Sequence, residues 1–261
     1  MINDQKPVTN DQKPAARDQL IYGIRPVMEA LKSGKEIDRV LIQKGLKGEG
    51  YHQLFAFIRN LEIPAQFVPA EKLNRITRHN HQGVIAYVSE IAYQKLDYLV
   101  PFIYEEGRTP LILILDRITD VRNFGAIART AECAGVDALL LPLKGGAPVN
   151  ADAVKTSAGA LYKIPVCRCP DLSESIRYLK GSGLKILAAT EKSEKLYSQA
   201  DLTGPLALIL GSEEDGVSPG YLEMADEKIS IPLAGEIGSL NVSVAAGILL
   251  YEAIRQRGLE E

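Results

Sequence analysis

The sequence feature that most constrains the fold is an uninterrupted apolar run, LILIL, at residues 111–115. A strand with one solvated face alternates apolar and polar residues, whereas a strand covered by helices on both faces is apolar throughout. Further short apolar runs follow, with helical periodicity between several of them. The expected strands are 111–115, 138–141, 164–167, 185–189, 206–210 and 228–231, and the expected helices are 125–134, 152–160 and 172–180. This alternation predicts an α/β domain with a mostly parallel sheet over residues 110–261.

A smaller α/β unit is predicted in front of it, over residues 19–93. Its expected helices are 22–31, 52–59 and 71–77, and its expected strands are 39–42, 65–68 and 83–88. Residues 94–109 contain Pro101, Gly107 and several charges and are followed by Pro110, so they are expected to form a linker that can hold one helical turn at 98–104. Residues 1–18 repeat the polar motif NDQKP and are expected to be a disordered tail.

Composition narrows the class of protein. The 261-residue chain has a net charge of −3, so no overall basic field indicates nucleic acid. Residues 19–95 nevertheless hold 11 Lys and Arg against 7 Asp and Glu, which weakly favours RNA binding there. Three cysteines are typical of a reduced, cytoplasmic protein. The apolar runs are too short to cross a membrane. The second domain contains no histidine, and no metal site is expected.

The last part of the chain is the strongest candidate for a site. Residues 231–257 read IPLAGEIGSLNVSVAAGILLYEAIRQR, a loop followed by a helix that Asn241 or Ser243 can cap. The small residues at 245–247 indicate that a backbone or a ligand approaches the first helical turns closely. Core packing alone does not require polar residues at the entrance to a helix, so a site is favoured here.

Three loops that follow strands carry unusual residues: 116–129, 210–218 and 231–247. In open α/β sheets, ligands bind beyond the carboxyl ends of the strands. None of the loops contains a glycine-rich dinucleotide fingerprint or a P-loop, which disfavours an NAD-type dehydrogenase. Without histidine in this domain, a hydrolytic triad cannot be assembled within it.

These loops resemble the three motifs of the SpoU/TrmH family of RNA ribose 2′-O-methyltransferases. The matching stretches are NFGAIAR at 123–129, GSEEDG at 211–216 and IPL followed by SLNVSVAAG within 231–247. The sequences YGIRPV at 22–27 and HQGVIA at 81–86 are similar to the ribosomal-protein-like RNA-binding domain of the family's rRNA-modifying branch. The resemblance implies a knotted SPOUT-type methyltransferase domain at 110–261, preceded by an RNA substrate-binding domain at 19–93.

The resemblance also implies S-adenosylmethionine as the cofactor. By position, Gly211, Ile231 and Leu240 match the family's cofactor contacts, which are made largely by backbone atoms. Thr190, at the end of another strand, is a weaker candidate for the same role.

Five polar residues match functional positions of the family: Asn123, Arg129, Glu213, Ser239 and Asn241. In the family, the arginine is proposed to take the proton of the ribose 2′-hydroxyl. A guanidinium stays protonated in nearly all settings. Two roles therefore stay open for Arg129: a base in a perturbed site, or a cation that binds phosphate and stabilises developing alkoxide charge.

Each of these residues also has a plain structural interpretation. Helix capping could be the sole role of Asn123, Ser239 and Asn241. Arg129 could lie on a solvated helix face, and Glu213 could occupy an exposed turn. Where many family members have glycine, this chain has Glu214. A positive φ there would strain the glutamate by ~1 kcal/mol.

The resulting hypothesis is that the protein methylates the 2′-oxygen of a guanosine ribose in large-subunit (23S) rRNA. The alternatives are a tRNA 2′-O-methyltransferase and a non-catalytic RNA-binding or ribosome assembly factor. The histidine- and arginine-rich segment 75–81 is either an RNA contact or solvated surface. The resemblance further implies a homodimer formed through the C-terminal domain.

Overall fold

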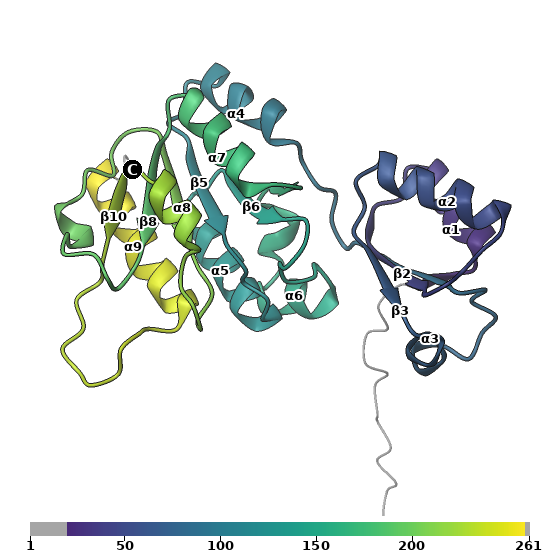
Figure 1. Cartoon of the computed structure of the whole chain (residues 1–261). Helices are drawn as coiled ribbons and strands as arrows, with labels where there is room; N and C mark the ends of the chain where they lie inside the picture. The colour runs from purple at the N-terminus through teal and green to yellow at the C-terminus, as the bar shows by residue number, and fades with distance from the viewer. Residues whose placement is uncertain (1–19, 259–261) are drawn as a thin grey trace, which may run out of the picture.

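Two β-sheets organise the chain in the computed structural model, which describes residues 20–258 (Figure 1). We call the part around the first sheet the first unit (residues 20–88) and the part around the second sheet the second unit (residues 96–257). The tail expected at 1–18 lies outside the described residues. Both units are α/β, as the sequence predicts.

The first unit has a four-stranded sheet in the order β1-β4-β2-β3. Its strands are β1 (Leu20–Tyr22), β2 (Ile37–Gln43), β3 (Ala65–Val68) and β4 (Val84–Val88), and its helices are α1 (Ile24–Lys32), α2 (Glu49–Asn60) and α3 (Ala70–Ile76). Helices α1 and α2 bury their apolar stripes on one face of the sheet, and α3 packs on the other face. The helix expected at 22–31 is preceded by β1, which the sequence did not indicate.

The second unit has a six-stranded sheet in the order β10-β8-β9-β5-β6-β7, and every neighbouring pair is parallel. Its strands are β5 (Leu111–Leu115), β6 (Ala138–Pro142), β7 (Val166–Cys169), β8 (Lys185–Ala189), β9 (Leu206–Leu210) and β10 (Glu227–Ile229). Its helices are α4 (Leu96–Glu105), α5 (Val121–Cys133), α6 (Ala151–Thr156), α7 (Leu172–Gly181), α8 (Pro219–Met224) and α9 (Val242–Arg257), with 3-10 turns η1 (Ala160–Tyr162) and η2 (Tyr197–Gln199).

The apolar run of β5 has the predicted cause. Leu111, Leu113 and Leu115 lie in a core shared with α5 and α9, whereas Ile112 and Ile114 lie in a second core shared with α4 and α7. All five residues are buried, because helices cover both faces of the sheet. At ~25 cal/mol per Å² of apolar surface, this burial is a main source of stability for the unit.

Two predicted helices differ from the observed ones by four residues at one end. Helix α5 begins at Val121 rather than at residue 125, because Asp120 caps it and accepts hydrogen bonds from the backbone of Arg122 and Asn123, both at 2.8 Å. The helix expected at 152–160 ends at Thr156, because Ala158 and Gly159 take left-handed backbone conformations with φ of 51° and 85°. These caps and breaks are local geometry that apolar periodicity does not report.

The segment expected to be a linker, 94–109, contains the ten-residue helix α4. Val100 and Ile103 are buried in the core that α4 shares with α7. Pro101 lies within the helix and explains why the sequence favoured no more than a turn. Most of this segment is therefore part of the second unit's packing.

A buried polar cluster joins the two units. Asp38 of β2 accepts hydrogen bonds from the guanidinium of Arg168 in β7 and from the Tyr93 hydroxyl at 3.0 Å. The Arg168 guanidinium also lies 4.0 Å from the centre of the Tyr93 ring. Breaking such a buried pair by removing one partner typically costs ~3–5 kcal/mol, so this cluster is a firm contact between the units.

Helix α9 closes the second unit by packing against α5. It follows a long loop, residues 230–241, that extends from the end of β10 (Figure 1). The trefoil knot implied by the resemblance stays a prediction, and this arrangement is consistent with it. Within residues 20–258, no helix is long and apolar enough to cross a membrane.

Candidate active site

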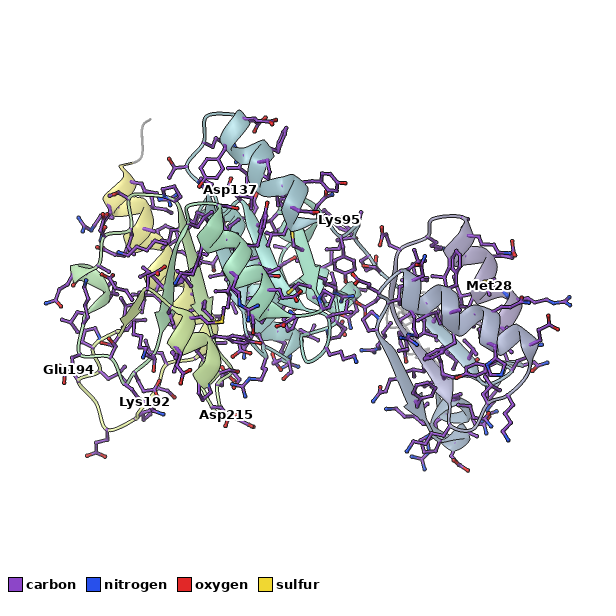
Figure 2. All side chains as sticks on the ribbon, turned by 45° about the horizontal axis from the view of Figure 1, so that its top comes forward. Met28, Lys95, Asp137, Lys192, Glu194 and Asp215 are labelled. Atoms are coloured by element: carbon purple, nitrogen blue, oxygen red, sulfur yellow. The ribbon has the colours of Figure 1, made fainter. Side chains whose placement is uncertain are left out.

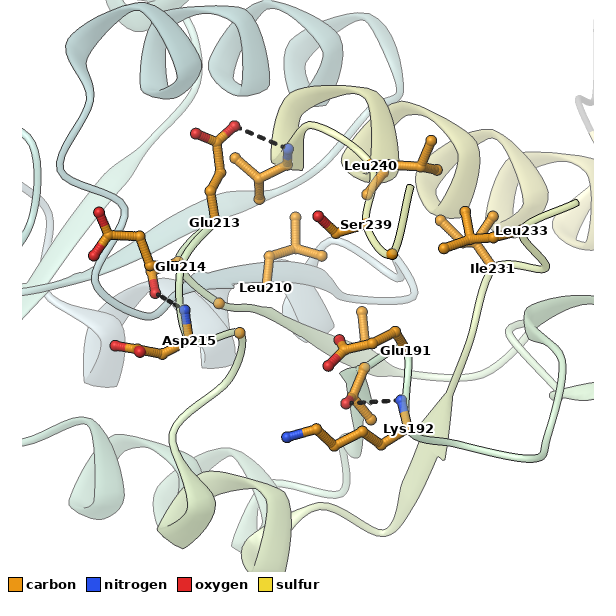
Figure 3. Close-up of a pocket in the computed structure, with 18 of the residues that line it drawn as sticks. Glu191, Lys192, Leu210, Glu213, Glu214, Asp215, Ile231, Leu233, Ser239 and Leu240 are labelled. Carbon is orange, nitrogen blue, oxygen red and sulfur yellow. Dashed lines mark hydrogen bonds between the residues drawn. The ribbon is translucent and has the colours of Figure 1, made fainter. Parts of the chain in front are cut away.

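The loops that leave the carboxyl ends of the parallel strands meet at one end of the second unit. Figure 2 shows Lys192, after β8, and Asp215, after β9, at this end, with Asp137 at the opposite end of the strands. A cavity of about 460 Å³ opens among the loops after β8, β9 and β10 (Figure 3). We call it the larger cavity. It lies where an open α/β sheet is expected to bind a ligand.

All four residues predicted to contact a cofactor line the larger cavity: Thr190, Gly211, Ile231 and Leu240. Gly211 begins the loop at residues 211–216, which we call the 211–216 loop. A Cβ atom on Gly211 would lie 2.0 Å from the backbone carbon of Gly216. Only glycine permits this approach of one end of the loop to the other.

The lining of the larger cavity is apolar on one side and acidic on the other. Figure 3 shows Ile231, Leu233 and Leu240 on the loop that follows β10. The 211–216 loop, on the opposite side, carries the carboxylates of Glu213, Glu214 and Asp215, and the loop after β8 adds Glu191 and the ammonium group of Lys192 (Figure 3). The cavity therefore suits a ligand with a flat apolar part and positive charge.

A smaller cavity of about 380 Å³ adjoins the larger one. Arg117, Asp120 and Asn123 line it from the loop between β5 and α5. Four residues of the 211–216 loop, together with Val242, line both cavities: Ser212, Glu213, Glu214 and Asp215. The 211–216 loop is therefore the wall between the two cavities.

Three of the predicted catalytic residues are joined by hydrogen bonds at this wall. The side-chain amide of Asn241 donates to Asn123 Oδ1 at 3.0 Å and to Glu213 Oε1 at 2.6 Å. Asn241 Oδ1 accepts from the backbone of Ser243 at 2.9 Å and so caps α9, as one of the two predicted alternatives stated. Asn241 thus links all three loops that the sequence singled out.

The other two predicted catalytic residues are not in this cluster. Ser239 lines the larger cavity and points into it (Figure 3). Arg129 lies on the exposed side of α5, outside the lining of both cavities. Glu213 has no bond to Arg129 among the described residues; it bonds to Asn241 and to the backbone of Val242.

Two of the structural interpretations are settled by the geometry. Asn123 does not cap α5, because Asp120 does, and its side chain is free to bond to Asn241. Glu214 has no positive φ, so the strain considered for it does not arise. Of the residues in this turn, Gly216 takes the left-handed conformation, with a φ of 67°.

The sequence missed a charged group beside the 211–216 loop. Arg117 and Asp116 follow β5 directly, and the Arg117 guanidinium bonds to Asp215 at 2.8 Å. Burial lowers the pKa of Arg117, but the carboxylates of Asp116 and Asp215 more than offset this, so its pKa is raised above the ordinary value. The only signal in the sequence was an Asp-Arg pair at the carboxyl end of the central strand.

Comparison with known proteins agrees with this geometry. Residues 110–251 match the SpoU rRNA Methylase family, and residues 20–94 match a family described as RNA 2′-O ribose methyltransferase substrate binding. The 23S rRNA (guanosine-2′-O-)-methyltransferase RlmB of Vibrio parahaemolyticus is 38% identical over 246 residues, which are 92% of this chain and 97% of that protein.

Solved structures show the same architecture. The SpoU methyltransferase AviRb of Streptomyces viridochromogenes, in complex with the cofactor AdoMet, is 26% identical, covers 91% of this chain and 90% of its own, and has a TM-score of 0.58. A TrmH/SpoU tRNA modifying enzyme of A. aeolicus is 34% identical over 62% of this chain and 84% of its own, with a TM-score of 0.53. The chain therefore belongs to the SpoU rRNA methylase family and is an RNA 2′-O-ribose methyltransferase.

Proposed function

We propose that this chain methylates the ribose 2′-oxygen of a guanosine in large-subunit (23S) rRNA, with S-adenosylmethionine as the methyl donor. The observation that carries the proposal is the 211–216 loop, which separates a cavity suited to the cofactor from a polar cavity suited to a ribose. The similarity to a 23S rRNA guanosine methyltransferase over nearly the full length of both proteins supports the choice of RNA.

The residues of the larger cavity fit S-adenosylmethionine. Its aliphatic wall suits the adenine ring, and its volume falls within the ~300–1,000 Å³ typical of small-molecule sites. The carboxylates opposite suit the sulfonium and ammonium groups. Gly211 keeps the backbone of the 211–216 loop open to close approach. When bound, S-adenosylmethionine supplies a methyl group that its positive sulfur already activates.

The protein's own task is to place and deprotonate the ribose hydroxyl. Asn241 fixes Glu213 Oε1, so the second carboxylate oxygen of Glu213 is left to face the ribose. Asn123, on the smaller cavity, is held by the same amide and is positioned to orient the RNA. Ser239 supplies a hydroxyl beside the cofactor.

Arg129 acts, in this proposal, at a site completed by a second copy of the chain. It lies on the exposed side of α5, and α5 packs against α9, whose exposed face presents Val244 and Tyr251 at 50% and 54% exposure. These two residues are seven apart, so they lie on one side of the helix. Exposed apolar side chains along one side of a long helix are a candidate contact surface, and this one supports the proposed homodimer through the second unit.

Tyr251→Glu is expected to convert the dimer to a monomer. The substitution places a charge in the centre of the apolar face of α9, where burial without a partner is unfavourable. Size-exclusion chromatography with light scattering measures the change in mass. The matched control is Tyr98→Glu, at an exposed aromatic of α4 on the other face of the sheet, which should stay dimeric. A dimeric Tyr251→Glu variant would contradict this interface.

The first unit is proposed to bind the RNA and to set the choice of rRNA over tRNA. His79 stacks on Tyr22 with ring centres 4.9 Å apart, and exposed Arg75 and Arg78 lie in the same segment. Stacked rings and cations are the groups that bind unpaired RNA bases and phosphates. His81, in contrast, bonds to Asn74 and to the backbone of Gly83, which indicates a structural role. An rRNA substrate implies a cytoplasmic location.

The test is transfer of a labelled methyl group to RNA. The purified chain is incubated with labelled S-adenosylmethionine in two separate reactions, one with 23S rRNA fragments and one with tRNA. Incorporation into a ribose of the 23S rRNA fragments alone is the expected result. Incorporation into tRNA would favour the tRNA alternative, and tight RNA binding without incorporation would favour an assembly factor.

A further inference from the structure

Arg117 has a backbone conformation that an arginine rarely adopts. Its φ is 58°, one of four positive values at non-glycine residues in the described part of the chain. The left-handed region costs an L-residue with a Cβ more than it costs glycine. Such strain persists where the surrounding structure over-determines it, and it clusters at functional sites. The side-chain contacts of Arg117 show what holds it there.

The guanidinium of Arg117 uses all three of its nitrogen atoms. Nε donates to Asp116 Oδ1 at 3.3 Å, Nη1 to Asp215 Oδ2 at 2.8 Å, and Nη2 to the carbonyl oxygen of Gly216 at 3.0 Å. Two of the three acceptors lie at the far end of the 211–216 loop. A planar guanidinium that bonds to several acceptors fixes their relative positions, which an ammonium group cannot do in the same way.

Asp116 contacts the residues that flank the same loop. It is 2% exposed, its backbone donates to Leu210 at 2.8 Å, and its Oδ2 accepts from the backbone of Ser218 at 2.7 Å. The two residues after β5 therefore contact the chain on both sides of the 211–216 loop. The tip of the loop is held separately, through Glu213 and Asn241.

We propose that Arg117 is a positioning residue, whose strained backbone aims its guanidinium at Asp215 and Gly216 and so holds the 211–216 loop in the form that binds S-adenosylmethionine. The inference rests on the proposed assignment of the larger cavity to that cofactor. Asp215 lines this cavity, and the backbone of Gly216 lies against Gly211. A shift at this end of the loop therefore changes the cofactor's wall directly.

The test compares stability with cofactor affinity in four single variants of the full chain and in the double variant Arg117→Gly/Asp215→Ala. Arg117→Gly removes the guanidinium and the backbone strain together. Arg117→Lys keeps a positive charge and the strain but loses the three-way contact. Asp215→Ala removes the main acceptor without touching the strained residue. Ala158→Gly is the control, because Ala158 also has a left-handed φ, 51°, but lies outside both cavity linings.

We expect Arg117→Gly to melt within about 3 °C of the parent chain, because strain relief offsets the lost contacts. Its Kd for S-adenosylmethionine, measured by calorimetry without RNA, should rise about tenfold. Arg117→Lys should bind more tightly than Arg117→Gly yet melt lower. The Kd of Asp215→Ala should equal that of Arg117→Gly. The double variant should bind S-adenosylmethionine no more weakly than either single variant. Ala158→Gly should melt no lower than the parent and bind with the parent's Kd.

A parental Kd in Arg117→Gly would overturn the inference. If that variant does not fold, the result is read from Asp215→Ala, and a parental Kd there overturns the inference equally. Additive losses in the double variant would show that Arg117 and Asp215 act separately, which also contradicts it. A parent chain that fails to bind S-adenosylmethionine would contradict the proposed cofactor itself, and the inference with it.

Discussion

Gly211→Ala is expected to weaken S-adenosylmethionine binding by at least about 100-fold. The added Cβ would lie 2.0 Å from the carbon of Gly216, and 2.1 Å from both the Gly216 oxygen and the Val217 nitrogen. All three are backbone atoms, so no side-chain rotation can make room. The 211–216 loop must open, and it forms the wall of both cavities. A displacement of this kind removes a preorganised site, which typically costs several kcal/mol of binding.

Calorimetric titration with S-adenosylmethionine measures this effect directly. Gly220→Ala is the matched control, since a Cβ on Gly220 would meet no atom within 4 Å and the residue lies in α8. That variant should bind with the parent's affinity and gain a little helix stability, ~0.5–1 kcal/mol. Parental affinity in Gly211→Ala would show that the cofactor does not lie against this loop.

Asn241→Asp is expected to lower turnover at least about 100-fold while the protein stays folded. Aspartate keeps the size and the capping oxygen of asparagine, so α9 still begins at the same place. The lost amide, however, is the group that donates to both Asn123 and Glu213. A carboxylate there would face Glu213 at hydrogen-bond distance, and like charges so close repel strongly. Loss of one positioned donor in an active site typically costs ~10²–10³ in rate.

The measurement is methyl transfer under single-turnover conditions, alongside cofactor affinity. We expect the single-turnover rate constant to fall while the Kd for S-adenosylmethionine changes less than about tenfold, because Asn123, which loses its donor, lines only the smaller cavity. Asn150→Asp is the matched control, because Asn150 caps α6 by the same kind of bond, to the backbone of Ala153 at 3.0 Å. Full activity in Asn241→Asp would show that this cluster only caps a helix.

The main architecture was predictable because buried strands and helices have characteristic patterns of apolar residues. The five apolar residues of β5 report helices on both faces, and the order of strands and helices reports a parallel sheet. The loops at strand ends could be found for the same reason, since a strand that stops at polar and glycine residues marks where a ligand can bind. The predicted cofactor residues accordingly lie along one cavity.

Other features of the structure have no local sequence pattern that predicts them. The left-handed backbone of Arg117 depends on acceptors about a hundred positions away in the chain, which no local pattern reveals. Helix α4 contains Pro101 and was therefore expected to be a linker, although its packing on the second sheet stabilises it. The position of Arg129 outside both cavities also could not be read from a motif, because a motif gives the order of residues and not their positions in space.

Mapping of 2′-O-methylated riboses in large-subunit rRNA tests the central claim most directly. The rRNA is taken from cells that lack the gene and from the same cells carrying either the parent chain or Asn241→Asp. We predict that one methylated guanosine disappears without the gene, returns with the parent chain and does not return with the variant. An unchanged methylation map in cells lacking the gene, with a nucleotide lost from tRNA instead, would contradict the account.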